Sequence, residues 1–147
     1  MNRSTNEIIG ILNEFTPFSE NDLENDNVDF LYQLTDELLM NSDANLAIRP
    51  MFELVEKFPN QDFGSPGPIV HFIEKFRGLY ETELFKSLQR IPTLLTIWML
   101  NRLINSEKDE TIRDNLLIKM KEILVHQKAG ELEKEEATNF LDYQLKN

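Results

Sequence analysis

Hydrophobic residues recur three or four positions apart along most of the chain, which is the spacing of one face of an α-helix. Ser4 and Glu7 fit a capping box at the start of the first helix. The apolar face of that helix follows as Ile8, Ile11, Leu12 and Phe15. Alternating β-branched runs, which would indicate strands, are almost missing. The pattern therefore predicts an all-α fold.

The same spacing predicts helices along the rest of the chain. The helix around Trp98 is apolar nearly all round, which is typical of a central helix that is covered on several sides. The apolar positions of the predicted helices are, in order, Val28, Leu31, Leu34, Thr35 and Leu38; Ile48, Met51, Phe52 and Val55; Ile69, Phe72, Ile73 and Phe76; Tyr80, Leu84, Leu88 and Ile91; Leu94, Leu95, Ile97, Trp98, Met99, Leu100, Leu103 and Ile104; Ile112, Leu116, Met120, Ile123 and Leu124; and Ala137, Phe140 and Leu141.

Prolines and glycines predict where several of these helices begin and end. Pro50 must either kink the third helix or begin a fresh one as its first residue. Ser65 is predicted to cap the fourth helix, with Pro66 as its first residue and Gly78 at its end. Pro92 is predicted to open the sixth helix.

Short loops between successive helices favour antiparallel helix pairs. The helices that end at Pro59 and Pro92 are each followed by an apolar helix, and these prolines lie 33 residues apart. That period falls in the range of helical-pair repeats. We expect residues 1–147 to form one domain of stacked antiparallel helix pairs, a HEAT-like α-solenoid, with a closed helical bundle as the alternative.

Acidic residues are concentrated in the first part of the chain. The formal net charge is −11, and residues 1–60, with 12 acidic and 3 basic residues, carry −9 of it. Residues 61–147 are near-neutral, with 14 acidic and 12 basic residues. Between Arg3 and Arg49 there are ten acidic residues and no lysine or arginine. A field of one sign raises the encounter rate with a basic partner and repels nucleic acid and anionic membranes.

The candidate partner-binding residues lie within this base-free stretch. They are Glu20, Asp22, Glu24, Asp26, Asp29, Asp36, Glu37 and Asp43. The alternative interpretation is a solvated face that keeps the protein soluble. Ordinary surface helices intersperse both signs to gain i,i+4 pairs, so a stretch without bases favours a binding role.

Composition excludes several classes of site. The chain has no cysteine, which excludes disulfides, thiolate metal sites and cysteine nucleophiles. Its first residues have too short an apolar stretch for a signal peptide, and no segment approaches the ~20 apolar residues of a membrane span. We therefore expect a cytoplasmic protein that binds neither nucleic acid nor membrane.

Catalytic and metal-binding patterns are weak. His71 and Glu74 lie one helical turn apart, but a metal site needs at least three convergent protein ligands. The run that starts at Asp22 resembles a calcium loop, yet Asn27 stands where glycine is required and Gln33 where glutamate is required. The sequence predicts no catalytic residue, no cofactor and no metal.

Three segments carry a resemblance to a protein family: Phe63–Glu74, which contains the Gly-Ser-Pro-Gly-Pro turn, Ser87–Thr93 and Trp98–Asn105. They resemble small all-helical bacterial immunity proteins that are encoded beside secreted polymorphic toxins. The resemblance implies a HEAT-like stack of helix pairs in a cytoplasmic protein that binds and neutralises one toxin domain and has no chemistry of its own.

The expected partner is therefore a basic toxin domain such as a nuclease, because active sites that handle nucleic acid must be basic. Two alternatives stay open. One is a general helical-repeat scaffold with a different protein partner. The other is a small-ligand carrier or enzyme that uses His71, Glu74 and the residues around Trp98.

Overall fold

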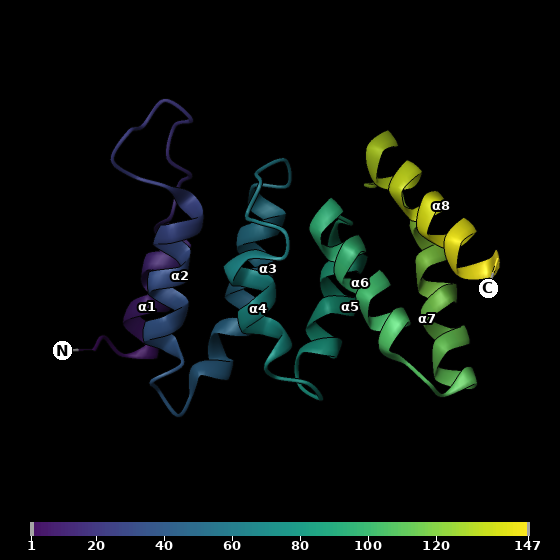
Figure 1. Ribbon diagram of the computed structural model, residues 1–147, viewed down its shortest axis with the longest axis horizontal. Helices are drawn as coiled ribbons and strands as arrows, with labels where there is room; N and C mark the ends of the chain where they lie inside the picture. The colour runs from purple at the N-terminus through teal and green to yellow at the C-terminus, as the bar shows by residue number, and fades with distance from the viewer. Residues whose placement is uncertain (1, 147) are drawn as a thin grey trace. The chain divides into compact units, whose positions relative to one another are not determined.

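The computed structural model describes residues 2–146, which contain eight α-helices and one short 3-10 helix and no strand (Figure 1). The predicted all-α class is confirmed. The elements are α1 (Thr5–Glu14), α2 (Asn27–Leu38), η1 (Ala44–Ala47), α3 (Ile48–Lys57), α4 (Gly67–Glu74), α5 (Tyr80–Arg90), α6 (Leu94–Ser106), α7 (Glu110–Ile123) and α8 (Glu131–Lys146). The chain divides into two compact units, residues 1–83 and residues 84–147, with the boundary inside α5.

Polar side chains at their N-termini explain why several helices start where they do. The Ser4 Oγ accepts the Glu7 N–H at 3.1 Å and the Glu7 carboxylate accepts the Ser4 N–H, so the predicted capping box is confirmed. Asp26 caps α2 and Asp109 caps α7 in the same way, each accepting one backbone N–H of the first turn. Thr93 caps α6. These bonds satisfy donors that have no partner inside the helix.

The proline predictions need correction. Pro50 is the third residue of α3, not the first, and it fits there because first-turn N–H groups have no intrahelical acceptor. Pro66, not Ser65, is the residue that precedes α4. Pro92 lies before Thr93 and does not open α6, because the threonine hydroxyl supplies the cap. Gly78 lies in the turn after α4, which ends at Glu74.

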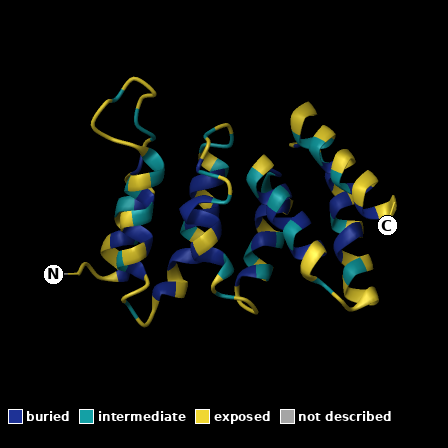
Figure 2. Ribbon diagram, viewed as in Figure 1, coloured by how far each residue is buried: buried dark blue, intermediate teal, exposed yellow. Residues whose placement is uncertain are grey.

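In the first unit, α1 packs against α2 and α3, and α2 packs against α4. Successive helices of this unit run in opposite directions (Figure 1), and buried residues occupy one side of α1, α2 and α3, whereas α4 is buried nearly all round (Figure 2). Phe52, Phe63 and Phe72 are almost fully enclosed in this unit. Burial of side chains of this size stabilises the folded state by about 1.5–3 kcal/mol each.

The segment before α1 is fastened to α2 by one ion pair. The guanidinium of Arg3 donates from Nε and Nη2 to the two carboxylate oxygens of Glu37, at 3.1 and 2.9 Å. The Arg3 backbone N–H donates to the same carboxylate at 2.6 Å. These hydrogen bonds, the side-chain bond first, lower the pKa of Glu37 from its ordinary 4.5 to about 2.

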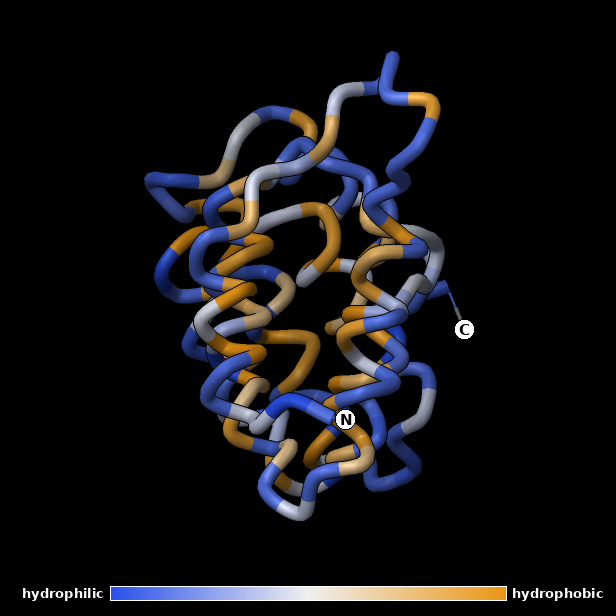
Figure 3. Tube along the Cα trace, turned by 90° about the vertical axis from the view of Figure 1, so that its left-hand side faces the viewer, coloured by the Kyte–Doolittle hydropathy of each residue, from blue (hydrophilic) through white to orange (hydrophobic). Residues whose placement is uncertain are grey.

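In the second unit, α6 packs against α7 and α8, and α7 packs against α8. The buried side of α6 includes Ile97, Leu100 and Ile104. In the view from the side of α1 and α2, hydrophobic and hydrophilic positions are interspersed along the trace (Figure 3). Several predicted apolar positions are not buried: Ile112 is 48% and Leu94 37% exposed. Half-buried positions are Ile91, Leu95, Trp98, Leu124 and Phe140.

A polar network lies inside the second unit. The Gln144 side chain on α8 is 5% exposed and donates from Nε2 to the Oδ1 atoms of Asn101 and Asn105 on α6, at 2.9 and 2.6 Å. Its Oε1 accepts from Arg113 Nη2 on α7 at 2.7 Å. One side chain therefore joins three helices and fixes their register.

We expect Gln144→Leu, which keeps the volume of the side chain and removes its polar atoms, to lower the free energy of unfolding by about 1–3 kcal/mol, because Asn101 and Arg113 lose a partner in a buried place. Urea denaturation of the whole chain measures this. The matched control is Gln127→Leu at an exposed position, for which a change within about 0.5 kcal/mol is expected. Equal stability of the two variants would contradict a structural role for the network.

The Arg3–Glu37 pair predicts a dependence of stability on pH. Since the folded pKa of Glu37 lies below its ordinary value, the pair stabilises the fold above pH 4.5, and this contribution is lost as the pH falls through about 2. Glu37→Gln should therefore lower Tm at neutral pH, and the difference from wild type should shrink as the solution is acidified. Arg3→Gln should show the same profile, and the double variant should add little. A Tm difference that stays constant with pH would disprove the linkage.

Candidate protein-binding surface

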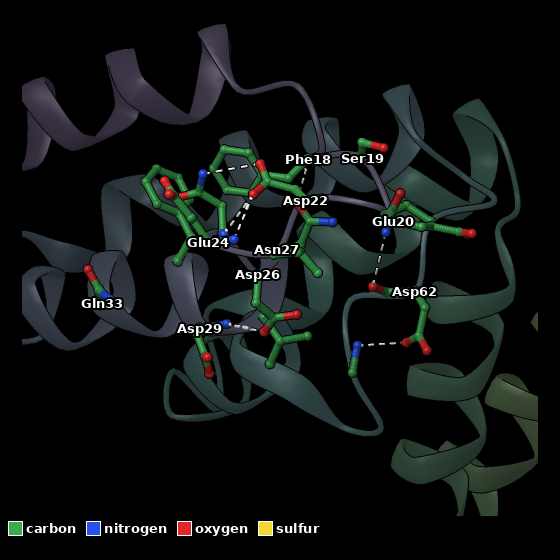
Figure 4. Close-up of a pocket in the computed structure, with 16 residues that line it drawn as sticks. Phe18, Ser19, Glu20, Asp22, Glu24, Asp26, Asn27, Asp29, Gln33 and Asp62 are labelled. Atoms are coloured by element: carbon green, nitrogen blue, oxygen red, sulfur yellow. Dashed lines mark hydrogen bonds between the residues drawn. The ribbon is translucent and has the colours of Figure 1, made fainter.

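The loop between α1 and α2 and the connection between α3 and α4 enclose an open hollow of about 750 Å³, which we call the acidic hollow (Figure 4). Its lining residues include six carboxylates and no lysine, arginine or histidine. The carboxylates are Glu20, Asp22, Glu24, Asp26, Asp29 and Asp62. The structure thus brings together five of the eight acidic residues singled out in the sequence and adds one from a later segment.

Hydrogen bonds within the loop fix its backbone. The Phe18 N–H donates to Asn27 Oδ1 at 2.8 Å, which ties the start of the loop to the first residue of α2. Asp22 Oδ1 accepts the backbone N–H groups of Glu24 and Asn25, at 2.9 and 3.0 Å. Asn25 Nδ2 donates to the other oxygen of Asp22, and these bonds, the side-chain bond first, lower the pKa of Asp22. The loop therefore has a defined conformation although it is mostly exposed (Figure 2).

Asp26 stabilises the start of α2. Its Oδ2 accepts the Asp29 N–H at 3.0 Å and so caps α2. A negative charge here also interacts favourably with the positive end of the helix dipole. Asp29 lies in the first turn, and its side chain is exposed. The N-terminus of α2 thus offsets part of the repulsion between the carboxylates of the hollow.

Three phenylalanine rings support the loop from beneath. Phe15 stacks on Phe30 of α2, with ring centroids 5.6 Å apart and an interplanar angle of 13°. Phe18 meets both rings edge to face, at 6.0 and 5.5 Å. Such aromatic pairs contribute about 0.5–1.5 kcal/mol each beyond the area they bury. Phe18 and Phe30 also line the acidic hollow, so the same cluster anchors the loop and forms an apolar part of the hollow.

The opposite side of the hollow comes from the connection between α3 and α4. Asp62 Oδ1 accepts the Gly64 N–H at 2.8 Å, which leads into the Gly-Ser-Pro-Gly-Pro turn. Gly64 has φ of +102°, and a Cβ there would lie 2.6 Å from the Cα of Gly67. Only glycine fits this close approach. The tight turn holds Asp62 at the rim of the hollow.

The other three predicted residues lie outside the hollow. Glu37 is paired with Arg3, and Asp43 accepts a hydrogen bond from Thr5 Oγ1 at 2.6 Å. Asp36 is exposed on α2. Proximity in sequence therefore did not predict one continuous surface, because Glu37 and Asp43 take part in fastening the start of α1.

An exposed leucine stands among the carboxylates. Leu23 is 99% exposed at the tip of the loop, between Asp22 and Glu24. When a partner covers a large exposed apolar side chain, the free energy of the complex is lowered. The acidic hollow thus combines negative charge with an apolar contact point, and sequence reasoning missed Leu23, Phe18 and Asp62. The signal for Leu23 was a single leucine in a run of charged and amide residues.

The alternative site predicted around His71 is not part of the acidic hollow. The Tyr32 hydroxyl and His71 Nδ1 share a hydrogen bond of 2.9 Å, which joins α2 to α4. Within residues 2–146, no group of three or more histidine, cysteine or acidic side chains is placed to hold a metal ion. Trp98 belongs to the second unit, and the guanidinium of Arg102 lies over its ring at 5.1 Å.

Comparison with protein-family models, with curated proteins and with solved structures finds no match to this chain. The resemblance to immunity proteins therefore stays a prediction. Across the described part of the chain, no helix is both long enough and apolar enough to span a membrane.

We expect Asp22→Ala to loosen the tip of the loop, because the amides of Glu24 and Asn25 lose their acceptor. Their exchange with solvent, measured by NMR, should become about fivefold faster, which corresponds to one hydrogen bond of ~1 kcal/mol. The matched control is Glu20→Ala in the same loop, which should leave both rates unchanged. Unchanged rates in Asp22→Ala would show that the carboxylate does not hold the turn.

Proposed function

We propose that this protein is a non-catalytic binding module whose acidic hollow receives a basic protein partner. One observation carries the proposal: six carboxylates from two separate segments line a single hollow that has no basic side chain in its lining. A solubilising face does not need this convergence, because charges spread over a surface keep a protein soluble equally well.

Charge and apolar area have separate roles in this proposal. The carboxylates raise the rate of encounter with lysine- and arginine-rich surfaces, and salt weakens that effect. Leu23 and the edge of Phe18 supply apolar area that a partner covers once it has docked. Binding energy in interfaces is concentrated in a few such apolar anchors surrounded by polar contacts.

The more specific form of the proposal is an immunity protein that neutralises a basic toxin domain such as a nuclease. Its support is the resemblance of the Phe63–Glu74, Ser87–Thr93 and Trp98–Asn105 segments and the need of a nuclease site for positive charge. We further propose a HEAT-like arrangement of helix pairs. In the first unit, α1 packs against α3 and α2 against α4, as in two stacked pairs. A general scaffold with another basic partner is the alternative, and the toxin assay below separates the two.

Reversing the outward charges of the hollow tests the proposal. The triple variant Glu20→Lys, Glu24→Lys and Asp29→Lys leaves the structural carboxylates Asp22 and Asp26 intact. We expect association with a basic toxin domain that the wild-type protein binds to slow by at least about tenfold and to lose most of its salt dependence. Stopped-flow or surface-based binding kinetics at two salt concentrations measure both effects, and co-expression with the toxin reports neutralisation.

The matched control reverses the same number of charges elsewhere, in the variant Asp114→Lys, Glu135→Lys and Asp142→Lys, whose positions are exposed in the second unit. It should associate nearly as fast as wild type. Equal loss in both triple variants would show that only net charge matters, and full killing by the toxin with no complex formed would disprove the immunity function. Loss of function in His71→Ala with intact binding would favour the enzyme or ligand-carrier alternative.

A further inference from the structure

A second hollow lies along α1 and is mainly apolar. It is a shallow, widely open depression of about 470 Å³, which we call the α1 groove. Gly10 and Ile11 form its floor, while Glu7 and Glu14 stand one turn before and one turn after them on the same helix face. The groove is therefore an apolar strip with a carboxylate toward each end.

Gly10 is a residue that the fold itself does not require. It lies inside α1, where glycine costs about 0.5–1 kcal/mol relative to alanine. A Cβ at this position would meet no atom within 4 Å, and the backbone is not in the left-handed region. No neighbour in this chain therefore accounts for the missing side chain, and its effect is to keep the floor of the groove open.

The α1 groove and the acidic hollow adjoin each other, because Phe18 and Phe30 line both. Glu7 and Glu14 extend the negative charge of the hollow along the groove. An occupant of this surface must present apolar side chains to the groove and positive charge to both of its ends.

We propose that the α1 groove receives an amphipathic basic helix of the partner, with its apolar face against Gly10 and Ile11 and its lysines or arginines toward Glu7, Glu14 and the acidic hollow. This inference rests on the proposed function and names the element of the partner that is recognised. Helices enter apolar grooves through residues spaced three and four apart. Addition of a partner strand needs an open sheet edge, and residues 2–146 contain no strand.

The groove has room for such a row of side chains. Its volume of about 470 Å³ is open to solvent along α1. Salt screens the carboxylates over roughly 8 Å at physiological ionic strength, so charge alone holds a partner weakly. The apolar strip therefore determines how long the complex lasts, and the charges determine how fast it forms and in which orientation.

A pair of synthetic peptides tests the inference on the intact protein. The first is a fluorescein-labelled leucine–lysine peptide of about five helical turns, with its leucines on one face. The second has the same composition in an order that gives no apolar face. Fluorescence anisotropy should show that wild type binds the amphipathic peptide at least about tenfold more tightly, the equivalent of 1.4 kcal/mol.

Filling the groove should remove this preference. Gly10→Leu projects a side chain into the open floor and should weaken binding of the amphipathic peptide by about tenfold or more, while binding of the scrambled peptide stays the same. The matched control, Asn13→Leu, adds the same side chain to an exposed position of α1 that does not line the groove, and it should bind as wild type does. Circular dichroism and Tm confirm that both variants keep the fold, which is expected because leucine is a better helix former than glycine or asparagine.

The outcomes separate this inference from the proposed function. If Gly10→Leu binds the amphipathic peptide as wild type does, while the triple lysine variant of the hollow still loses the toxin, the groove inference is overturned and the proposed function stands. If a glutamine version of the amphipathic peptide binds as tightly as the lysine version, the basic character of the occupant is disproved. If neither peptide binds and no toxin is neutralised, both proposals fall together.

Discussion

Like charges crowded around one hollow repel one another, so the acidic hollow depends on a backbone that other interactions hold in place. The cluster of Phe15, Phe18 and Phe30 supplies that support, because its rings clamp the loop onto α2. Two of the repelling carboxylates, those of Asp22 and Asp26, also accept hydrogen bonds from nearby backbone N–H groups. These two carboxylates therefore stabilise the backbone of the segment that carries the repelling charges.

The base-free stretch has three separate roles in the structure. Its middle part forms the loop and the first turn of α2, where Glu20, Glu24 and Asp29 are exposed and line the acidic hollow. Glu37 instead forms an ion pair with Arg3, the basic residue that precedes the stretch, and hydrogen bonds from Arg3 lower the pKa of Glu37. Asp43 accepts from a threonine of α1. A charge count along the sequence assigns these residues to one group, although Glu37 and Asp43 are engaged within the protein.

Helical spacing was sufficient to predict the helices, since burial of one face is what makes each helix stable, and it also predicted the Ser4–Glu7 capping box. A fresh start at Pro50, one of two alternatives, was misplaced because proline is tolerated at several first-turn positions, and α4 begins one residue after Pro66. The sequence predicted five of the six carboxylates that line the hollow, but not Asp62. Asp62 lies far from the acidic stretch along the chain, and only the glycine turn after α3 brings it to the same rim.

Phe18 links the two parts of the proposed surface, since it lines both the α1 groove and the acidic hollow. A partner helix that entered the groove without positive charge would leave the carboxylates facing one another with no counter-charge. A basic partner without an apolar ridge would be held only by pairs that salt screens. Under the proposed function, selectivity on this surface would require both features at a fixed distance on one helix. That demand is stricter than net charge alone, and it would let an acidic protein distinguish one basic protein from others.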